Sequence, residues 1–229
     1  SMNRRTLWHW PGVQGPKQRR GPRCSLASPV ALASVLAALS GLIVFLYPYY
    51  QQYAIKLRFE ATGARVTCDP RPPWPLQDRK AGELFEAITW VSFPKGHVDA
   101  EQLKLLPNCT ELVGLELAGT DVTDESLSNV QNLHALEILD LGDTLVGDRS
   151  LKTIGSLDSL QMLVLGGTLI SDDGLVELER LPQLSTLDLS RTAVGDKGAV
   201  VLSRLSTLTW LVLVHTKITD EGLRHIGRM

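Results

Sequence analysis

Leucine recurs every 24 residues through the second half of the chain. Each unit carries the pattern L-x-x-L-x-L, in which alternate positions are apolar. Alternate residues of an extended chain lie on one face, so this pattern predicts a short strand with one buried face. Five full units place these leucines at Leu112, Leu115, Leu117; Leu136, Leu139, Leu141; Leu160, Leu163, Leu165; Leu184, Leu187, Leu189; and Leu208, Leu211, Leu213.

A threonine follows each strand, at the position where the chain should turn. Its hydroxyl can bond to backbone groups that the turn leaves unpaired. Stacked units would therefore form a structural ladder of threonines. The ladder residues are Thr120, Thr144, Thr168, Thr192 and Thr216.

An aspartate follows each threonine and predicts the start of a short helix. A carboxylate at an N-cap accepts hydrogen bonds from free backbone N–H groups and favours the positive helix end. A calcium ladder is the rival interpretation, but one carboxylate per 24 residues supplies too few converging oxygen ligands. We therefore predict helix caps and no metal site. The cap residues are Asp124, Asp148, Asp172, Asp196 and Asp220.

A degenerate first unit precedes the five full ones. Its apolar residues are Ile88, Val91, Phe93, Val98, Leu103 and Leu106. A unit of strand, turn and short helix cannot bury its apolar face alone, but it can when stacked on a neighbour. Residues 88–229 therefore predict an α/β solenoid of about six repeats, with a curved parallel sheet inside and short helices outside.

The repeated pattern L-x-x-L-x-L-x-x-T-x-[IV]-x-D-x-G-L resembles the leucine-rich repeats of many bacterial proteins. The resemblance covers roughly residues 88–229. It implies a curved solenoid and a binding role, typically toward protein, without naming a partner. Threonine stands at the ladder position where the commonest version of the repeat has asparagine, so the resemblance assigns no receptor subfamily.

A long apolar segment precedes the repeats. Residues 26–47 contain no charged side chain and would span roughly 30 Å as a helix, the thickness of a bilayer's hydrocarbon core. Tyrosines follow directly, which suits a membrane–water boundary, and Pro48 should end or kink the helix. A cleaved signal peptide is the alternative, although its apolar region usually runs only about 7–15 residues. The segment predicts a single transmembrane helix.

The charge distribution predicts how this helix is oriented. Residues 1–25 form a basic arm with six Lys or Arg and no acidic residue. By the positive-inside rule the N-terminus should be cytoplasmic and the repeats extracytoplasmic. Residues 48–87 then form a juxtamembrane segment and a cap for the solenoid, with a short helix at residues 54–61 and a strand at residues 65–68.

Charge argues against nucleic-acid binding, and the absence of catalytic motifs argues against an enzyme. Residues 47–229 carry 17 basic and 25 acidic side chains, which disfavours nucleic-acid binding because phosphates need a basic surface. The sequence contains no G-x-S-x-G, no H-E-x-x-H and no phosphate-binding glycine loop. We therefore predict neither an enzyme nor a cofactor.

The residues between the strand leucines should point to the concave face, where side chains are normally polar. Several are instead apolar or acidic, which predicts a surface for a protein or peptide with apolar anchors and basic residues. The alternatives are tolerated β-formers, or a structural protein that associates with itself. The candidate residues are Ile138, Met162, Val164, Trp210, Val212 and Val214, with Glu116, Asp140 and Asp188 as an acidic stripe.

The three cysteines allow two interpretations. Cys68 and Cys109 could form a disulfide in an oxidising compartment. Cys109 also occupies a position at which later units have leucine, so it could be a small buried apolar residue. Cys24 lies beside the predicted anchor.

Overall fold

The computed structural model describes residues 29–70 and 86–227. The chain divides into two compact units, residues 1–45 and residues 46–229. Helix α1 (Pro29–Glu60) begins in the first unit and ends in the second.

Pro48 was predicted to end or kink a helix, and helix α1 shows that it does not end one. The helix continues past Pro48 to Glu60, so the separate helix predicted at residues 54–61 is its last part. Tertiary packing favours this continuation: Ile55 and Phe59 are buried, and the Phe59 ring meets Phe93 edge to face at 5.6 Å.

The predicted anchor lies partly outside the described residues. Residues 26–28 are not described, and neither is the basic arm of residues 1–25. Within the described ranges, no helix is long and apolar enough to cross a membrane. The anchor therefore stays a prediction.

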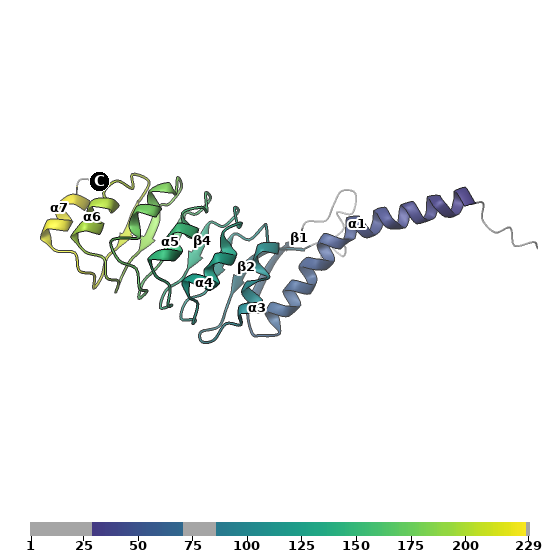
Figure 1. Cartoon of the computed structure of the whole chain (residues 1–229), viewed down its shortest axis with the longest axis horizontal. Helices are drawn as coiled ribbons and strands as arrows, with labels where there is room; N and C mark the ends of the chain where they lie inside the picture. The colour runs from purple at the N-terminus through teal and green to yellow at the C-terminus, as the bar shows by residue number, and fades with distance from the viewer. Residues whose placement is uncertain (1–28, 71–85, 228–229) are drawn as a thin grey trace, which may run out of the picture. The chain divides into compact units, whose positions relative to one another are not determined.

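Seven strands form one sheet in chain order (Figure 1). The first pair is antiparallel, and each later strand pairs in parallel with the next in a 24-residue register. The strands that pair in parallel are β2 to β7. The strands are β1 (Arg65–Pro70), β2 (Glu86–Ser92), β3 (Gly114–Glu116), β4 (Ile138–Asp140), β5 (Met162–Val164), β6 (Thr186–Asp188) and β7 (Trp210–Val212).

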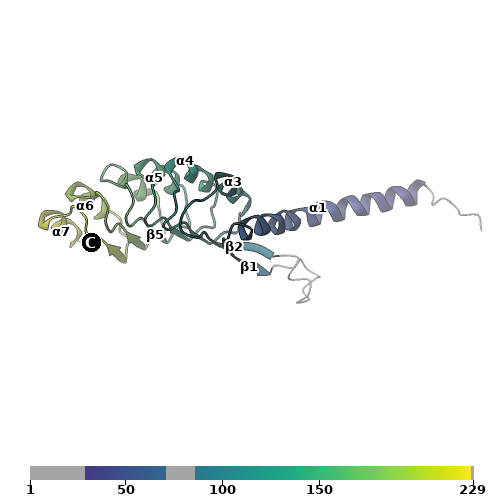
Figure 2. The same cartoon turned by 90° about the horizontal axis from the view of Figure 1, so that it is seen from below.

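Short helices follow the strands and cover one side of the sheet, while its other side stays uncovered (Figure 2). These helices are α3 (Ala100–Leu103), η1 (Leu106–Asn108), α4 (Asp124–Leu127), η2 (Ser128–Val130), α5 (Asp148–Ile154), η3 (Leu175–Arg180), α6 (Asp196–Leu202) and α7 (Asp220–Ile226).

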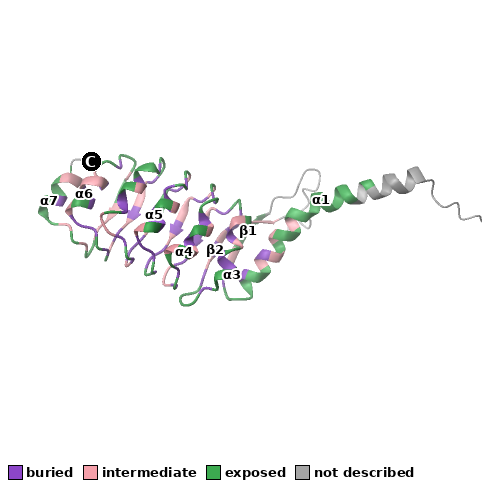
Figure 3. Ribbon diagram, viewed as in Figure 1, coloured by how far each residue is buried: buried purple, intermediate pink, exposed green. Residues whose placement is uncertain are grey.

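The core lies between the sheet and the helices (Figure 3). The strand leucines of the first four full repeats are at most 1% exposed, and the apolar residues of the degenerate first repeat are buried with them. Each ladder threonine donates its hydroxyl to the backbone carbonyl three residues earlier, as from Thr144 to Leu141 at 2.7 Å. The strand leucines thus form the core, and the threonine hydroxyls bond to the backbone of their own turns.

The aspartate column corrects a second prediction, because the aspartates do not cap their own helices. The caps of α4, α5, α6 and α7 are the preceding residues Thr123, Gly147, Gly195 and Thr219, and η3 begins three residues after Asp172. Four carboxylates instead accept a backbone N–H of the following repeat. These bonds join Asp124 to Gly147 (2.7 Å), Asp148 to Ser171 (2.8 Å), Asp172 to Gly195 (2.7 Å) and Asp196 to Thr219 (2.8 Å).

The reason is geometric. Stacking places each aspartate beside a backbone N–H of the next repeat that lies before the helix of that repeat, where helical hydrogen bonds have not yet begun. The aspartates thus connect successive repeats along the stack.

Cys68 and Cys109 are both free thiols in the structure, Cys109 fully buried. The position of Cys109 fits the interpretation as a small buried apolar residue. Burial raises its pKa to about 12.

Candidate functional site

The uncovered sheet face is built from rows of side chains that run across the strands. Residues paired in register lie side by side on adjacent strands, about 4.8 Å apart. The first row is Trp90, Gly114, Ile138, Met162, Thr186 and Trp210, and the second row is Ser92, Glu116, Asp140, Val164, Asp188 and Val212. A third row, two residues farther on, is Ala118, Gly142, Gly166, Ser190 and Val214.

The first row carries large apolar side chains that face solvent. Trp210 is 65% exposed and Met162 is 37% exposed. Ile138, one strand before Met162, is half-buried. The intervening strand leucines point into the core, which explains the alternation. The structure thus brings the predicted apolar residues onto one face.

Trp90 belongs to this row but was not among the predicted binding residues. A Cβ added at Gly114 would overlap the Trp90 ring, so the indole lies across the next strand at the place where that strand has no side chain. The glycine that follows Trp90 by 24 residues is the sequence signal that could have found this contact.

The second row is acidic. Glu116 and Asp140 are paired in register on adjacent strands, and Asp188 lies two strands farther along. No basic side chain occurs in the three rows as described. Burial raises the pKa of Asp140, and the charges of Glu116 and Asp188 act in the same direction, while a hydrogen bond from Gly142 N–H (2.9 Å) opposes them. A cation placed here would relieve this repulsion.

The third row leaves the carboxylates accessible. Gly142 and Gly166 have no side chain, and an added Cβ would lie 3.2 Å from Asp140 Oδ1 and 3.4 Å from Asp188 Oδ2, respectively. Asp188 Oδ1 accepts hydrogen bonds from the N–H and the hydroxyl of Ser190, which fix its position. Beside the acidic row, therefore, no side chain rises from the sheet at Gly142 and Gly166.

The rim beyond these rows has an unusual backbone. The residue before each ladder threonine has a positive φ, which glycine adopts readily and other residues at a cost of about 1 kcal/mol. Gly119 and Gly167 fit this requirement, but Asp143, Arg191 and His215 do not. Asp143 and Arg191 form an ion pair at 2.9 Å that passes over Gly167, whose Cβ would collide with it.

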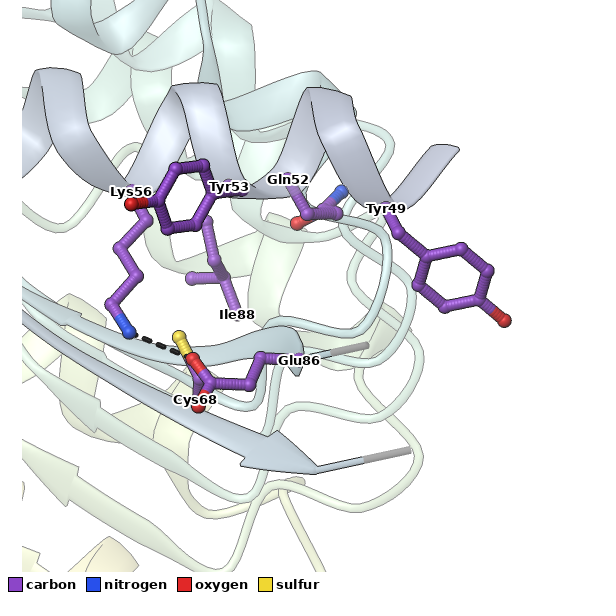
Figure 4. Close-up of a pocket in the computed structure, with 7 residues that line it drawn as sticks. All are labelled: Tyr49, Gln52, Tyr53, Lys56, Cys68, Glu86 and Ile88. Atoms are coloured by element: carbon purple, nitrogen blue, oxygen red, sulfur yellow. Dashed lines mark hydrogen bonds and ion pairs between the residues drawn. The ribbon is translucent and has the colours of Figure 1, made fainter. Parts of the chain in front are cut away.

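A small polar cluster lies between α1 and the β1–β2 hairpin (Figure 4). Lys56 Nζ pairs with Glu86 Oε2 at 2.7 Å, and Gln52 Nε2 donates to the Asn108 carbonyl at 2.6 Å. Burial raises the pKa of Cys68 to about 11, so this thiol is protonated and unreactive at neutral pH. The cavity is about 10 Å³, enough for one water molecule. This cavity therefore has no room for a substrate.

Neither histidines nor carboxylates form a metal centre in the part of the chain that the structure describes, where no group of three or more potential ligands converges. The exposed face built by the three rows is the strongest candidate site.

Comparison with known proteins identifies the type of repeat at the end of the chain. Residues 181–203 and 204–227 match the family model described as Leucine Rich repeat. The chain carries leucine-rich repeats. The matched segments are the last two, and the same register extends back through the paired strands to β2. The chain matches none of the curated proteins with which it was compared.

Among the solved structures to which this chain is similar is an internalin from Listeria monocytogenes. The two are 31% identical, with a TM-score of 0.47, over 55% of this chain. The match spans 36% of the internalin chain, so this chain corresponds to little more than a third of that protein's length.

Proposed function

We propose that this chain binds a protein or peptide partner through the sheet face of its leucine-rich repeats. The observation that carries the proposal is an uncovered face whose first row exposes Trp210 and Met162. The solvated face of a sheet is normally polar, and tryptophan is enriched among residues that dominate binding energy. An open, shallow surface of this kind suits a macromolecule better than a small ligand, which needs a concave pocket.

The side chains of the sheet face determine which kinds of partner side chain would fit it. Apolar side chains of the partner would cover the first row, and Lys or Arg side chains would reach the acidic second row. Glu116, Asp140 and Asp188 are the charged residues of the three described rows, so a basic segment is electrostatically complementary.

A photo-cross-linking experiment tests this proposal. A photoreactive residue is placed in the full chain at Thr186, on the sheet face, or at Val176, which is 50% exposed on η3. We expect adducts at Thr186 whose attached peptides are rich in Lys or Arg, and their loss on Met162→Asp or Trp210→Asp. Val176→Asp is the matched control. Equal adduct yields at the two positions, or yields that the sheet-face substitutions leave unchanged, would refute a sheet-face site.

We further propose that a membrane holds the chain through residues 26–47, with the N-terminus cytoplasmic and the repeats outside. Six consecutive residues of α1, Leu42–Tyr47, are large and apolar, and each is at least 37% exposed. A helix that is apolar all round is unfavourable in water. Alkaline washing should leave the chain in the membrane fraction, and an external protease should digest the repeats. Release by the wash would contradict the anchor.

A further inference from the structure

A row of exposed side chains runs along the side of the stack, at the residue that follows each ladder threonine. Backbone hydrogen bonds hold successive turns in register here, as from Leu169 N–H to the Val146 carbonyl at 2.8 Å. Stacking covers the two ends of a repeat, so a repeat added to the stack would lengthen this row and leave it uncovered. We call it the outer row, and its members are Asp121, Leu145, Leu169, Ala193 and Lys217, all exposed.

The two leucines of the outer row do not belong to the core. Leu145 is 56% exposed and Leu169 is 64% exposed, whereas Thr168 and Ile170 on either side of Leu169 are buried. The other full repeats have Asp, Ala or Lys at this position, so the fold accepts a small or charged side chain there. Packing within the chain therefore gives no reason for two exposed leucines on adjacent repeats.

The charges of the outer row are ordered about Leu169. Asp121 lies two repeats before Leu169, and Lys217 lies two repeats after it. Asp121 pairs with His97 and is still 46% exposed. Lys217 makes no ion pair within the described residues. Both charges are thus open to a partner at equal distances from Leu169.

The residues that precede the threonines have the same order of charges. Asp143 lies one repeat before Gly167, and Arg191 lies one repeat after it. Their ion pair at 2.9 Å leaves the two side chains 53% and 58% exposed. A two-fold rotation about the turn of Gly167 therefore exchanges acidic with basic positions in both rows.

We propose that this side of the stack binds a second copy of the chain about a two-fold axis at the turn of Gly167 and Leu169. A two-fold contact brings the same surface of both copies together, with the rows running in opposite directions. Leu169 then meets its own counterpart, and Leu145 of each copy meets Ala193 of the other. The apolar patch of one copy is thus covered by that of the other.

The same axis pairs the charges across the contact. Asp121 of each copy meets Lys217 of the other, and the Asp143–Arg191 pairs lie antiparallel, so that each carboxylate faces a guanidinium of the other copy. An unrelated partner would need a matching pattern, whereas a second copy carries it by symmetry. The rows extend only about 19 Å from Asp121 to Lys217, so the dimer should be weak and concentration-dependent.

Charges at the two-fold axis test this arrangement. The full chain is purified in a mild non-ionic detergent, and the protein mass of the particle is measured by light scattering across a dilution series. Leu169→Lys and Leu169→Asp each bring like charges together, so each variant should weaken the dimer at least about tenfold. An equimolar mixture of the two should dimerise again, because the introduced charges are then opposite. Val176→Lys, at an exposed position on η3, is the matched control and should leave the dimer unchanged.

The ends of the contact test its register. Lys217→Glu places like charges opposite Asp121 and should weaken the dimer, while Asp121→Lys added to the same chain should restore it. Circular dichroism checks that each variant is folded, since Asp121 also contacts His97. A wild-type chain that is monomeric at every concentration would overturn the proposal. So would a dimer that survives the Leu169 or Lys217 changes, a mixture that remains monomeric, or a folded double variant that binds no better than Lys217→Glu.

Discussion

At the residue scale, glycine positions in the helices are explained by the preceding repeat. Gly174, Gly198 and Gly222 each lie where a Cβ would collide with the aspartate of the repeat before. The glycines therefore allow the carboxylate that connects two repeats to approach the helix backbone. In each D-x-G sequence the glycine contacts the aspartate of the preceding repeat, and the aspartate contacts the glycine of the following repeat.

Substitution of one such glycine should destabilise the chain. In Gly198→Ala, the new Cβ would lie 2.5 Å from Asp172 Oδ1 and 2.8 Å from Leu175 Cδ1. Overpacking typically costs about 1–3 kcal/mol, partly offset by a gain in helix propensity of about 1 kcal/mol. We expect a net loss of roughly 1–2 kcal/mol in the free energy of unfolding, measured by urea denaturation. Lys197→Ala, at an exposed neighbouring position, is the control and should change stability by less than about 0.5 kcal/mol.

At the element scale, the turns that follow β2 and β3 are joined by an ion pair. His97 Nδ1 meets Asp121 Oδ2 at 2.5 Å, and the other carboxylate oxygen accepts the backbone N–H of Val98 at 2.9 Å. The hydrogen bond to Asp121 raises the pKa of His97, and the bond from His97 lowers the pKa of Asp121. Both shifts favour the charged pair.

The stability contribution of this pair should depend on pH in both directions. A raised histidine pKa stabilises the fold below the unfolded pKa, about 6.5, and the effect is lost as pH rises through the folded value. A lowered aspartate pKa stabilises the fold above about pH 4, and the effect is lost as pH falls through the folded value. The Tm difference between wild type and His97→Gln should therefore be greatest between about pH 4 and 6.5 and should shrink toward pH 8. A pH-independent difference, or one shared by the control His134→Gln, would contradict the pairing.

At the scale of the whole molecule, the solenoid is a stack in which each repeat contacts mainly its immediate neighbours; the Asp143–Arg191 ion pair, which crosses one repeat, is an exception. Every parallel strand pairs with the strand one repeat away, and each aspartate bond spans a single repeat boundary. Stability in such a stack is approximately a sum of repeat and nearest-neighbour terms. Coupling between core residues should therefore decay quickly along the chain.

Double-mutant cycles measure this decay. Leu139 and Leu163 are paired on adjacent strands, whereas Leu115 and Leu187 are three strands apart, about 14 Å. All four are fully buried, so each single change to alanine should cost about 2–5 kcal/mol. The distant pair should be additive within about 0.5 kcal/mol, and the adjacent pair should deviate by more. Equal coupling in both pairs would show that the solenoid does not unfold as a stack of local contacts.

The sequence by itself determined the repeat, the strand register and the buried leucines, because a 24-residue period repeats the same local chemistry in every unit. It also identified the side chains of the sheet face, since alternation along a strand assigns residues to one face or the other.

Tertiary structure alone decided what each contact joins. The aspartates bind the following repeat because stacking brings unpaired N–H groups of that repeat beside them. Helix α1 continues past Pro48, and Ile55 and Phe59 of its last part are buried in the core. The Trp90 ring lies over Gly114 because their strands are adjacent. Such contacts depend on distances between residues far apart in the chain, which a periodic pattern does not specify.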